Sequence, residues 1–140
     1  AAVIQHDSAA RIHGVLVQPM AASGTELVIG MRRDPMFGPI IMLGLGGIFV
    51  EALKDVAFAR APILRNDVPL MIDSLQGKAV FEGVRGQPPV DVETLTDVLV
   101  ALSQLAIEHP EIIEIDLNPV FATPDGFIAV DWLVLSTGTH

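Results

Sequence analysis

The stretch EIIEIDLNPV, residues 111–120, decides the fold, because it combines the apolar character of a buried strand with regularly spaced polar side chains. Side chains alternate between the two faces of a strand. One face therefore carries the three polar side chains, Glu114, Asp116 and Asn118. The following TPDG, residues 123–126, favours a tight turn, with Pro and Asp at its centre and Gly closing it. We therefore expect a β-hairpin in which this stretch pairs with FIAVDWLVL, residues 127–135.

The predicted hairpin brings polar side chains of its two strands together. If Thr123 pairs with Gly126, Asn118 falls opposite Asp131, and directly opposed residues have Cβ atoms about 4.5–5.5 Å apart. An amide oxygen and the carboxylates of Asp116 and Asp131 then converge. Mg²⁺ is held by one or two protein carboxylates, and water and substrate phosphates complete its shell. The hairpin predicts a magnesium site for a phosphate-bearing ligand, although a solvated sheet face with ordinary polar alternation would look the same.

The rest of the chain indicates an α+β fold. Strands are expected at 12–20, 25–33, 39–47 and 55–63 from their composition. The turn AASG joins the first two, which are therefore expected to form a hairpin. A short helix is expected over 67–75, with Asp67 as N-cap, and a long helix over 91–109, with Asp91 as N-cap and Pro110 after its end. We expect residues 1–140 to form a single domain, with a largely antiparallel sheet and helices packed on one face.

The composition excludes several classes of function. Half of the 140 residues are hydrophobic, which argues against disorder, and the formal net charge of −9 argues against nucleic acid or an anionic membrane as a partner. There is no cysteine, so disulfides and thiolate zinc sites are excluded, and a cytoplasmic location fits this composition. No apolar run is long enough to span a bilayer.

A second candidate site is the glycine-rich run LGLGGIFVE, residues 43–51. Gly46 and Gly47 allow close approach of a ligand to the backbone, whose successive N–H groups can hold an anion. Glu51 ends the run and could support a metal. A turn without a ligand is the alternative interpretation, because the run lacks the Lys and Ser or Thr of a Walker loop.

A third candidate is the arginine pair Arg32 and Arg33, which supplies a quarter of the basic residues of an acidic chain. A guanidinium group suits bidentate contact with phosphate, but a surface pair that balances Asp34 is equally expected. The four histidines share no spacing and indicate no site, and no nucleophile set of the Ser/His/Asp or Cys/His type can be assembled.

The segments RDPMFGP, GLGGIFVE and EIDLNPV, in this order and followed by FIAVD, together resemble the ATP-grasp domain of ADP-forming (NDP-forming) acyl-CoA synthetases. These enzymes are related to the succinyl-CoA synthetase β subunit, and the likeness covers roughly residues 10–135. It implies the C-terminal lobe of an ATP-grasp domain. It also implies a reaction in which acyl-CoA, ADP and phosphate are exchanged with an acid, CoA and ATP, through a phosphohistidine located outside this chain.

The resemblance also implies roles for particular residues. Asn118 and Asp131 would hold Mg²⁺, and Asp116 would orient the phosphohistidine at the nucleotide site. Gly46 and Gly47 would lie near the phosphates of ATP or ADP or near that histidine. With Arg33 and Glu51, indicated by the residue patterns described above, they make up the expected nucleotide- and phosphate-binding residues. Family members usually continue AVD with a small residue and then Arg, whereas Trp132 and Leu133 follow here.

The resemblance further implies that partners are required. The other ATP-grasp lobe and the CoA-binding domains, or a subunit that carries them, are expected outside these 140 residues, so we expect the chain to be a fragment that is inactive alone and that forms oligomers. Two alternatives stay open. One is a regulatory acyl-CoA or nucleotide sensor within a protein acetyltransferase, and the other is an interaction module without catalysis.

Overall fold

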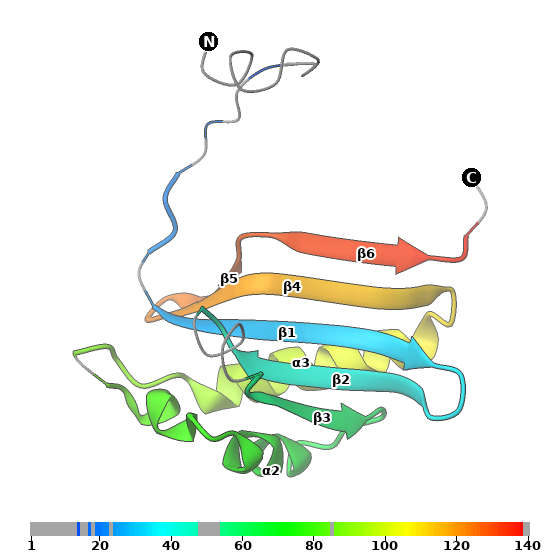
Figure 1. The fold of residues 1–140 in the computed structure, drawn as a ribbon, viewed down its shortest axis with the longest axis horizontal. Coiled ribbons are helices and arrows are strands. Elements are labelled where there is room, and N and C mark those ends of the chain that lie inside the picture. Colours follow the sequence, from blue (N-terminus) through cyan, green and yellow to red (C-terminus); the bar gives the residue numbers. More distant parts are fainter. Residues whose placement is uncertain are drawn as a thin grey trace.

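The computed structural model describes residues 24–47, 54–84 and 86–138, together with Gly14, Val17 and residues 19–22. The described part is a six-stranded sheet with helices on one side (Figure 1). Its elements, in chain order, are β1 (Thr25–Asp34), β2 (Gly38–Leu45), β3 (Val56–Arg60), α2 (Asp67–Ser74), the 3-10 helix η2 (Lys78–Glu82), α3 (Val92–Glu108), β4 (Ile112–Thr123), β5 (Gly126–Ala129) and β6 (Trp132–Ser136).

The strands follow the order β3-β2-β1-β4-β5, and β6 pairs with β4 beside β5. Each pairing between described strands is antiparallel. The predicted α+β class and the largely antiparallel sheet are therefore confirmed. The strand expected at 12–20, and its hairpin with 25–33, lie largely outside the described residues, and β1 pairs instead with β2 and β4.

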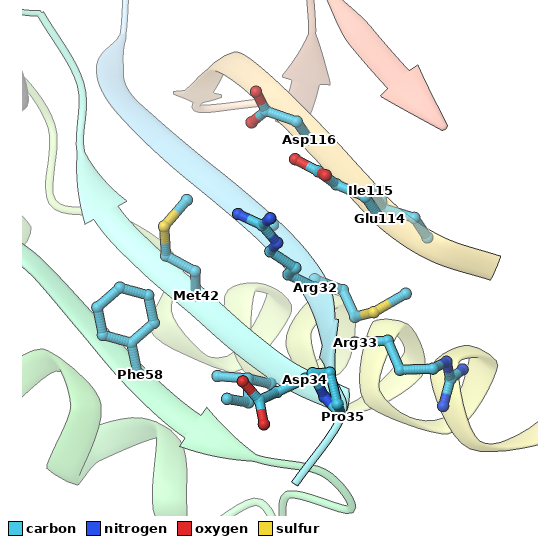
Figure 2. Close-up of a pocket in the computed structure, with 12 residues that line it drawn as sticks. Arg32, Arg33, Asp34, Pro35, Met42, Phe58, Glu114, Ile115 and Asp116 are labelled. Atoms are coloured by element: carbon cyan, nitrogen blue, oxygen red, sulfur yellow. The ribbon is translucent and has the colours of Figure 1, made fainter. Parts of the chain in front are cut away.

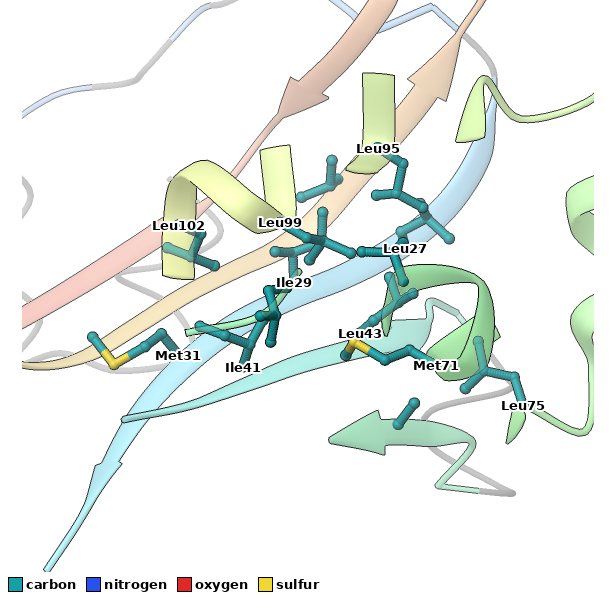
Figure 3. Close-up of a cluster of buried hydrophobic side chains, with 14 of the residues drawn as sticks. Leu27, Ile29, Met31, Ile41, Leu43, Met71, Leu75, Leu95, Leu99 and Leu102 are labelled. Carbon is teal, nitrogen blue, oxygen red and sulfur yellow. The ribbon is translucent and has the colours of Figure 1, made fainter. Parts of the chain in front are cut away.

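The core lies between the sheet and the helices because β1 and β2 each present an apolar side chain at every second position. The side chains on this face are fully or almost fully buried, and they pack against leucines of α3 and against Met71 of α2 (Figure 3). They are Leu27, Ile29, Met31, Ile41, Leu43 and Leu45. Alternation turns the residues between them to the other side of the sheet. No described helix covers that side (Figure 1), and we call it the open face.

The helices begin close to where the sequence predicted. In α3 the Asp91 carboxylate accepts a hydrogen bond from the backbone N–H of Thr94 at 3.1 Å, which confirms the predicted cap. The predicted cap of α2 is wrong, since its N-cap is Asn66. Asp67 is instead the first helical residue, and its carboxylate accepts the backbone N–H of Leu64 at 2.7 Å, which closes the turn before the helix.

The C-terminal hairpin has the predicted register. Thr123 pairs with Gly126, and the backbone N–H of Asn118 donates to the carbonyl of Asp131 at 3.2 Å. The second strand, however, is not continuous: β5 ends at Ala129, and β6 resumes at Trp132 in the same register.

No helix among the described residues is long and apolar enough to cross a membrane.

Candidate functional site

The open face carries a row of side chains that crosses the sheet through Asp116. The strand register places Asp116 opposite Gly30 on one side and opposite Leu133 on the other. Gly30 lies opposite Met42, which lies opposite Phe58 on the edge strand β3. An acidic side chain, a glycine, a thioether and an aromatic ring thus follow one another across four strands.

A second row lies one step further along the strands. Arg32 is opposite Glu114 on β4 and opposite Ile40 on β2, and Ile40 is opposite Arg60. The two rows form the floor of a cavity of about 730 Å³, which extends to Asp34 and Pro35 at the end of β1. Figure 2 shows Arg32 on the same face as Met42 and Asp116. The cavity therefore presents both a cation and carboxylates above an otherwise apolar floor.

Asp116 has an altered pKa in this cavity. Partial burial raises its pKa above the ordinary value, and the negative charges of Glu114 and Asp131 raise it further. A carboxylate in these surroundings gains from a nearby positive charge or from hydrogen-bond donors, because either would stabilise its ionised form. Asp116 is therefore suited to accept a hydrogen bond from a ligand.

Asn118 and Asp131 lie beside Asp116 and are both exposed. Their backbone hydrogen bond holds the two residues opposite each other, as predicted from the turn. Asp131 also accepts the backbone N–H of Trp132 on Oδ1 at 2.8 Å, which orients its carboxylate. In the described part of the chain, no cluster of three or more His, Cys, Asp or Glu side chains could hold a metal. A hard cation here would therefore take one amide oxygen and one or two carboxylates, and the ligand would supply further oxygens.

The glycine pair directly follows β2. Gly46 donates its backbone N–H to the carbonyl of Glu26 at 2.7 Å, and Gly47 has a φ of +61°, a conformation that favours glycine. A Cβ on Gly46 would lie 2.5 Å from Cγ of Glu26. Both glycines line a smaller cavity of about 240 Å³ together with Glu26 and with Val80 of η2. Glu51, predicted with them, lies outside the described residues.

The two arginines point to opposite sides of the sheet. Arg33 donates from Nε to the carbonyl of Ile112 at 3.1 Å, and from Nη2 to those of Ala106 at 2.7 Å and His109 at 3.2 Å. It thereby caps the C-terminal end of α3, where a cation is favourable. Figure 2 shows Arg33 directed toward the helix. These contacts hold Arg33 at the end of the helix, although it also lines the cavity, and its expected phosphate contact stays a prediction. Arg32 lines the same cavity and is exposed.

Sequence reasoning missed Gly30, Met42 and the choice between the two arginines. A signal was present in TELVIGMRR, because the apolar residues Leu27, Ile29 and Met31 alternate and place Arg33 on their own face. The same alternation turns Gly30 and Arg32 to the open face. The place of Met42 in the cavity could not be predicted, since it depends on the pairing of β1 with β2.

Comparison with known proteins places this geometry in a family. Residues 1–135 match the ATP-grasp domain family, so the chain belongs to it. It is 47% identical over 123 residues to "Acetate–CoA ligase [ADP-forming] I" of Archaeoglobus fulgidus, a match that covers 88% of this chain and 18% of that protein. It is 50% identical over 122 residues to the β subunit of the enzyme of the same name from Pyrococcus furiosus, covering 87% of this chain and 53% of the subunit.

Solved structures agree with this assignment. The dinucleotide forming acetyl-coenzyme A synthetase 1 of Ca. Korarchaeum cryptofilum, in complex with coenzyme A and Ca-AMPCP, superposes with a TM-score of 0.84 at 43% identity, covering 96% of this chain and 58% of that chain. A second structure of that enzyme holds Mg-AMPPCP, and its phosphohistidine segment points towards the nucleotide binding site; its TM-score is 0.77 at 44% identity, covering 83% of this chain and 55% of that one. The resemblance noted in the sequence is confirmed, and this chain spans little more than half of these relatives' chains at most.

Proposed function

We propose that this chain is the nucleotide- and Mg²⁺-binding part of an ADP-forming acyl-CoA ligase. The enzyme would interconvert acyl-CoA, ADP and phosphate with a carboxylic acid, CoA and ATP, through a phosphohistidine carried by the CoA-binding domains or subunit. The observation that carries the proposal is the position of Asp116 on the floor of the open-face cavity, with Asn118 and Asp131 directly beside it. A relative of the same fold, 44% identical, binds Mg-AMPPCP and has a phosphohistidine segment that points towards its nucleotide site.

Asn118 and Asp131 would hold the Mg²⁺. Their amide and carboxylate oxygens suit a hard cation, and the exposure of both side chains leaves room for water and nucleotide phosphates. When bound, Mg²⁺ neutralises the charge of the phosphate oxygens during transfer. Arg32 would contact a phosphate oxygen from the neighbouring row. Because the transferring phosphoryl group needs mainly positioning and charge neutralisation, these residues cover the requirements that lie on this chain.

Asp116 would orient the acceptor histidine. In the direction of ATP use, the unprotonated ring nitrogen attacks the γ-phosphorus, the bond to the bridging oxygen breaks, and ADP leaves. The other ring nitrogen keeps its proton, and its N–H donates to the Asp116 carboxylate, which fixes the tautomer and stabilises the positive charge that develops on the ring. The raised pKa of Asp116 fits a carboxylate whose cationic partner comes from the ligand.

The proposal is tested with Asp116→Asn in the complete enzyme, because asparagine keeps the size of the side chain and removes its charge. We expect formation of phosphohistidine from radiolabelled ATP to slow by about 10²–10³-fold, the range for loss of one contact that stabilises charge in the transition state. Asp125→Asn, at the exposed turn of the same hairpin, is the matched control and should transfer phosphate at the normal rate. Normal transfer by Asp116→Asn would show that the proposed role is wrong.

A further inference from the structure

Gly30 leaves a gap in the row of side chains that crosses the open face. It is buried in the middle of β1, between Met42 on one side and Asp116 on the other. A Cβ at this position would lie 3.1 Å from the carbonyl oxygen of Ile115 and 3.3 Å from Cε of Met42. Glycine weakens a strand interior, and there it often marks a place where a ligand comes close to the backbone. Gly30 therefore leaves a shallow depression in the cavity floor, with the Met42 methyl group on one side and, on the other, the strand that carries Ile115 and Asp116.

A flat ring with a polar edge suits this depression. The Met42 thioether is polarisable and makes favourable contacts with the edges of aromatic rings. Phe58, which is 63% exposed, continues the apolar floor beyond Met42. On the opposite side the Asp116 carboxylate can accept an N–H. A ring that lies over Gly30 would thus place its carbon edge against Met42 and its N–H against Asp116.

We propose that Gly30 and Met42 form the seat of an imidazole ring, so that the acceptor histidine lies over Gly30, against Met42, with its N–H donated to Asp116. This inference rests on the function proposed above. It assigns Gly30 and Met42 as positioning residues that determine how deeply and at what angle the ring enters. Their effect falls on the phosphoryl transfer step and leaves nucleotide binding unchanged.

The adenine ring of the nucleotide is the competing occupant. Asn118 and Asp131 lie directly beside Asp116, so the phosphate end of a metal-bound nucleotide lies next to this seat. The base is at the other end of the nucleotide and would lie away from Gly30. The position of the proposed cation ligands therefore favours imidazole over adenine.

The kinetic test compares Gly30→Ala, Met42→Ala and Met42→Leu in the complete enzyme. A small displacement of the ring from its reactive position lowers the rate of phosphoryl transfer strongly. We therefore expect Gly30→Ala and Met42→Ala to slow phosphohistidine formation by about 10- to 100-fold. The dissociation constant for ADP should stay within about twofold of that of the unaltered enzyme, because the proposed contacts are made with the histidine ring and not with the nucleotide. Met42→Leu keeps the volume of the side chain and should restore most of the rate. Ile128→Ala, an exposed apolar side chain that does not line the cavity, is the control.

A binding test needs no turnover. The methionine methyl groups of the complete enzyme, which include the five of these 140 residues, can be labelled with ¹³C and titrated with imidazole, and separately with adenosine. We expect imidazole to shift the Met42 methyl signal upfield through the ring current, and Gly30→Ala to abolish the shift, while the other methionine signals stay in place. A shift by adenosine without one by imidazole would overturn the inference.

The two proposals fail in different ways. If Asp116→Asn stops phosphate transfer while Gly30→Ala transfers normally and imidazole leaves Met42 unperturbed, the seat is refuted and the proposed function stands. If Asp116→Asn itself transfers normally, the proposed function and the seat that depends on it are both refuted. Thermal unfolding of Gly30→Ala shows whether the variant is folded. If it is not folded, the transfer rates of Met42→Ala and Met42→Leu test the proposed seat instead.

Discussion

Replacing Asp55 with alanine should destabilise the chain strongly, because this buried carboxylate holds a turn together. Asp55 is 3% exposed, and its two oxygens accept the backbone N–H groups of Gln76 at 2.8 Å and Gly77 at 2.7 Å. Hydrogen bonds to a charged group contribute about 1.5–3 kcal/mol each, and Asp55→Ala leaves both donors without their partner. We expect a loss of about 3–5 kcal/mol, a large share of the roughly 5–15 kcal/mol that stabilises a domain.

The assay is urea unfolding followed by the fluorescence of Trp132. With an m-value of about 2 kcal/mol/M, the midpoint should fall by about 2 M. Asp55→Asn keeps one acceptor oxygen and should lose less. Asp73→Ala removes an exposed carboxylate paired with Lys78 and should cost no more than about 1 kcal/mol. A loss below about 1 kcal/mol for Asp55→Ala would refute the reasoning, since the two backbone donors would then have found other partners.

Three further changes test other parts of the fold. Asp91→Ala removes the cap of α3 and should lower the free energy of unfolding at pH 7. Hydrogen bonds from Thr94 lower the pKa of Asp91 below its ordinary 3.8. The loss of stability relative to the unaltered chain should therefore be fully present above pH 3.8 and should disappear as the pH falls through the lowered pKa. Ser103→Ala leaves the N–H of Ile63, bonded to Ser103 Oγ at 2.9 Å, without a partner in the core and should cost about 1–3 kcal/mol in urea unfolding. Leu135→Lys on the apolar edge strand β6 should reduce self-association in sedimentation velocity, and an unchanged sedimentation coefficient would exclude β6 as the contact.

The register of the C-terminal hairpin could be predicted because turn chemistry determines it locally. Pro124 and Asp125 at the centre of the turn, with Gly126 closing it, set the pairing of Thr123 with Gly126, and every later pair follows from that one. The break between β5 and β6 could not be predicted in the same way. Val130 and Asp131 belong to a segment of uniform strand composition, and no Gly or Pro marks the place where pairing stops.

The two arginines show what alternation alone can and cannot establish. The apolar residues of β1 place Arg33 on the core face, a conclusion that needs only the sequence. Its role there depends on contacts far away in the chain, since the carbonyls that accept its hydrogen bonds belong to the end of α3 and the start of β4. The roles of two adjacent arginines in a strand can therefore be assigned only when the face on which each lies and the elements packed against that face are both known.

The distance between the glycine pair and Asp116 determines what a single ligand can contact. Gly46 is aligned with Glu26, and Asp116 with Gly30, so they are offset by four strand residues, about 13 Å along the strands, and by two strand spacings, about 10 Å across them, which gives a separation of about 16 Å. One phosphate group cannot touch both, but an extended nucleotide can. The glycine pair should therefore affect nucleotide affinity, and Asp116 the transfer step.

Gly47→Ala tests this division of roles. Gly47 has a φ of +61°, and a Cβ there would lie 3.1 Å from Oε2 of Glu26, so a methyl group would disturb both the backbone and the cavity wall. Gly126→Ala is the matched control, because Gly126 also has a positive φ but has open space around it and lies at the hairpin turn, outside the cavity that the glycine pair lines. Both variants should lose a similar amount of stability, about 1–2 kcal/mol. Only Gly47→Ala should weaken binding of Mg-ADP in calorimetry on the complete enzyme, and equal affinities in the two variants would show that the glycine pair does not contact the nucleotide.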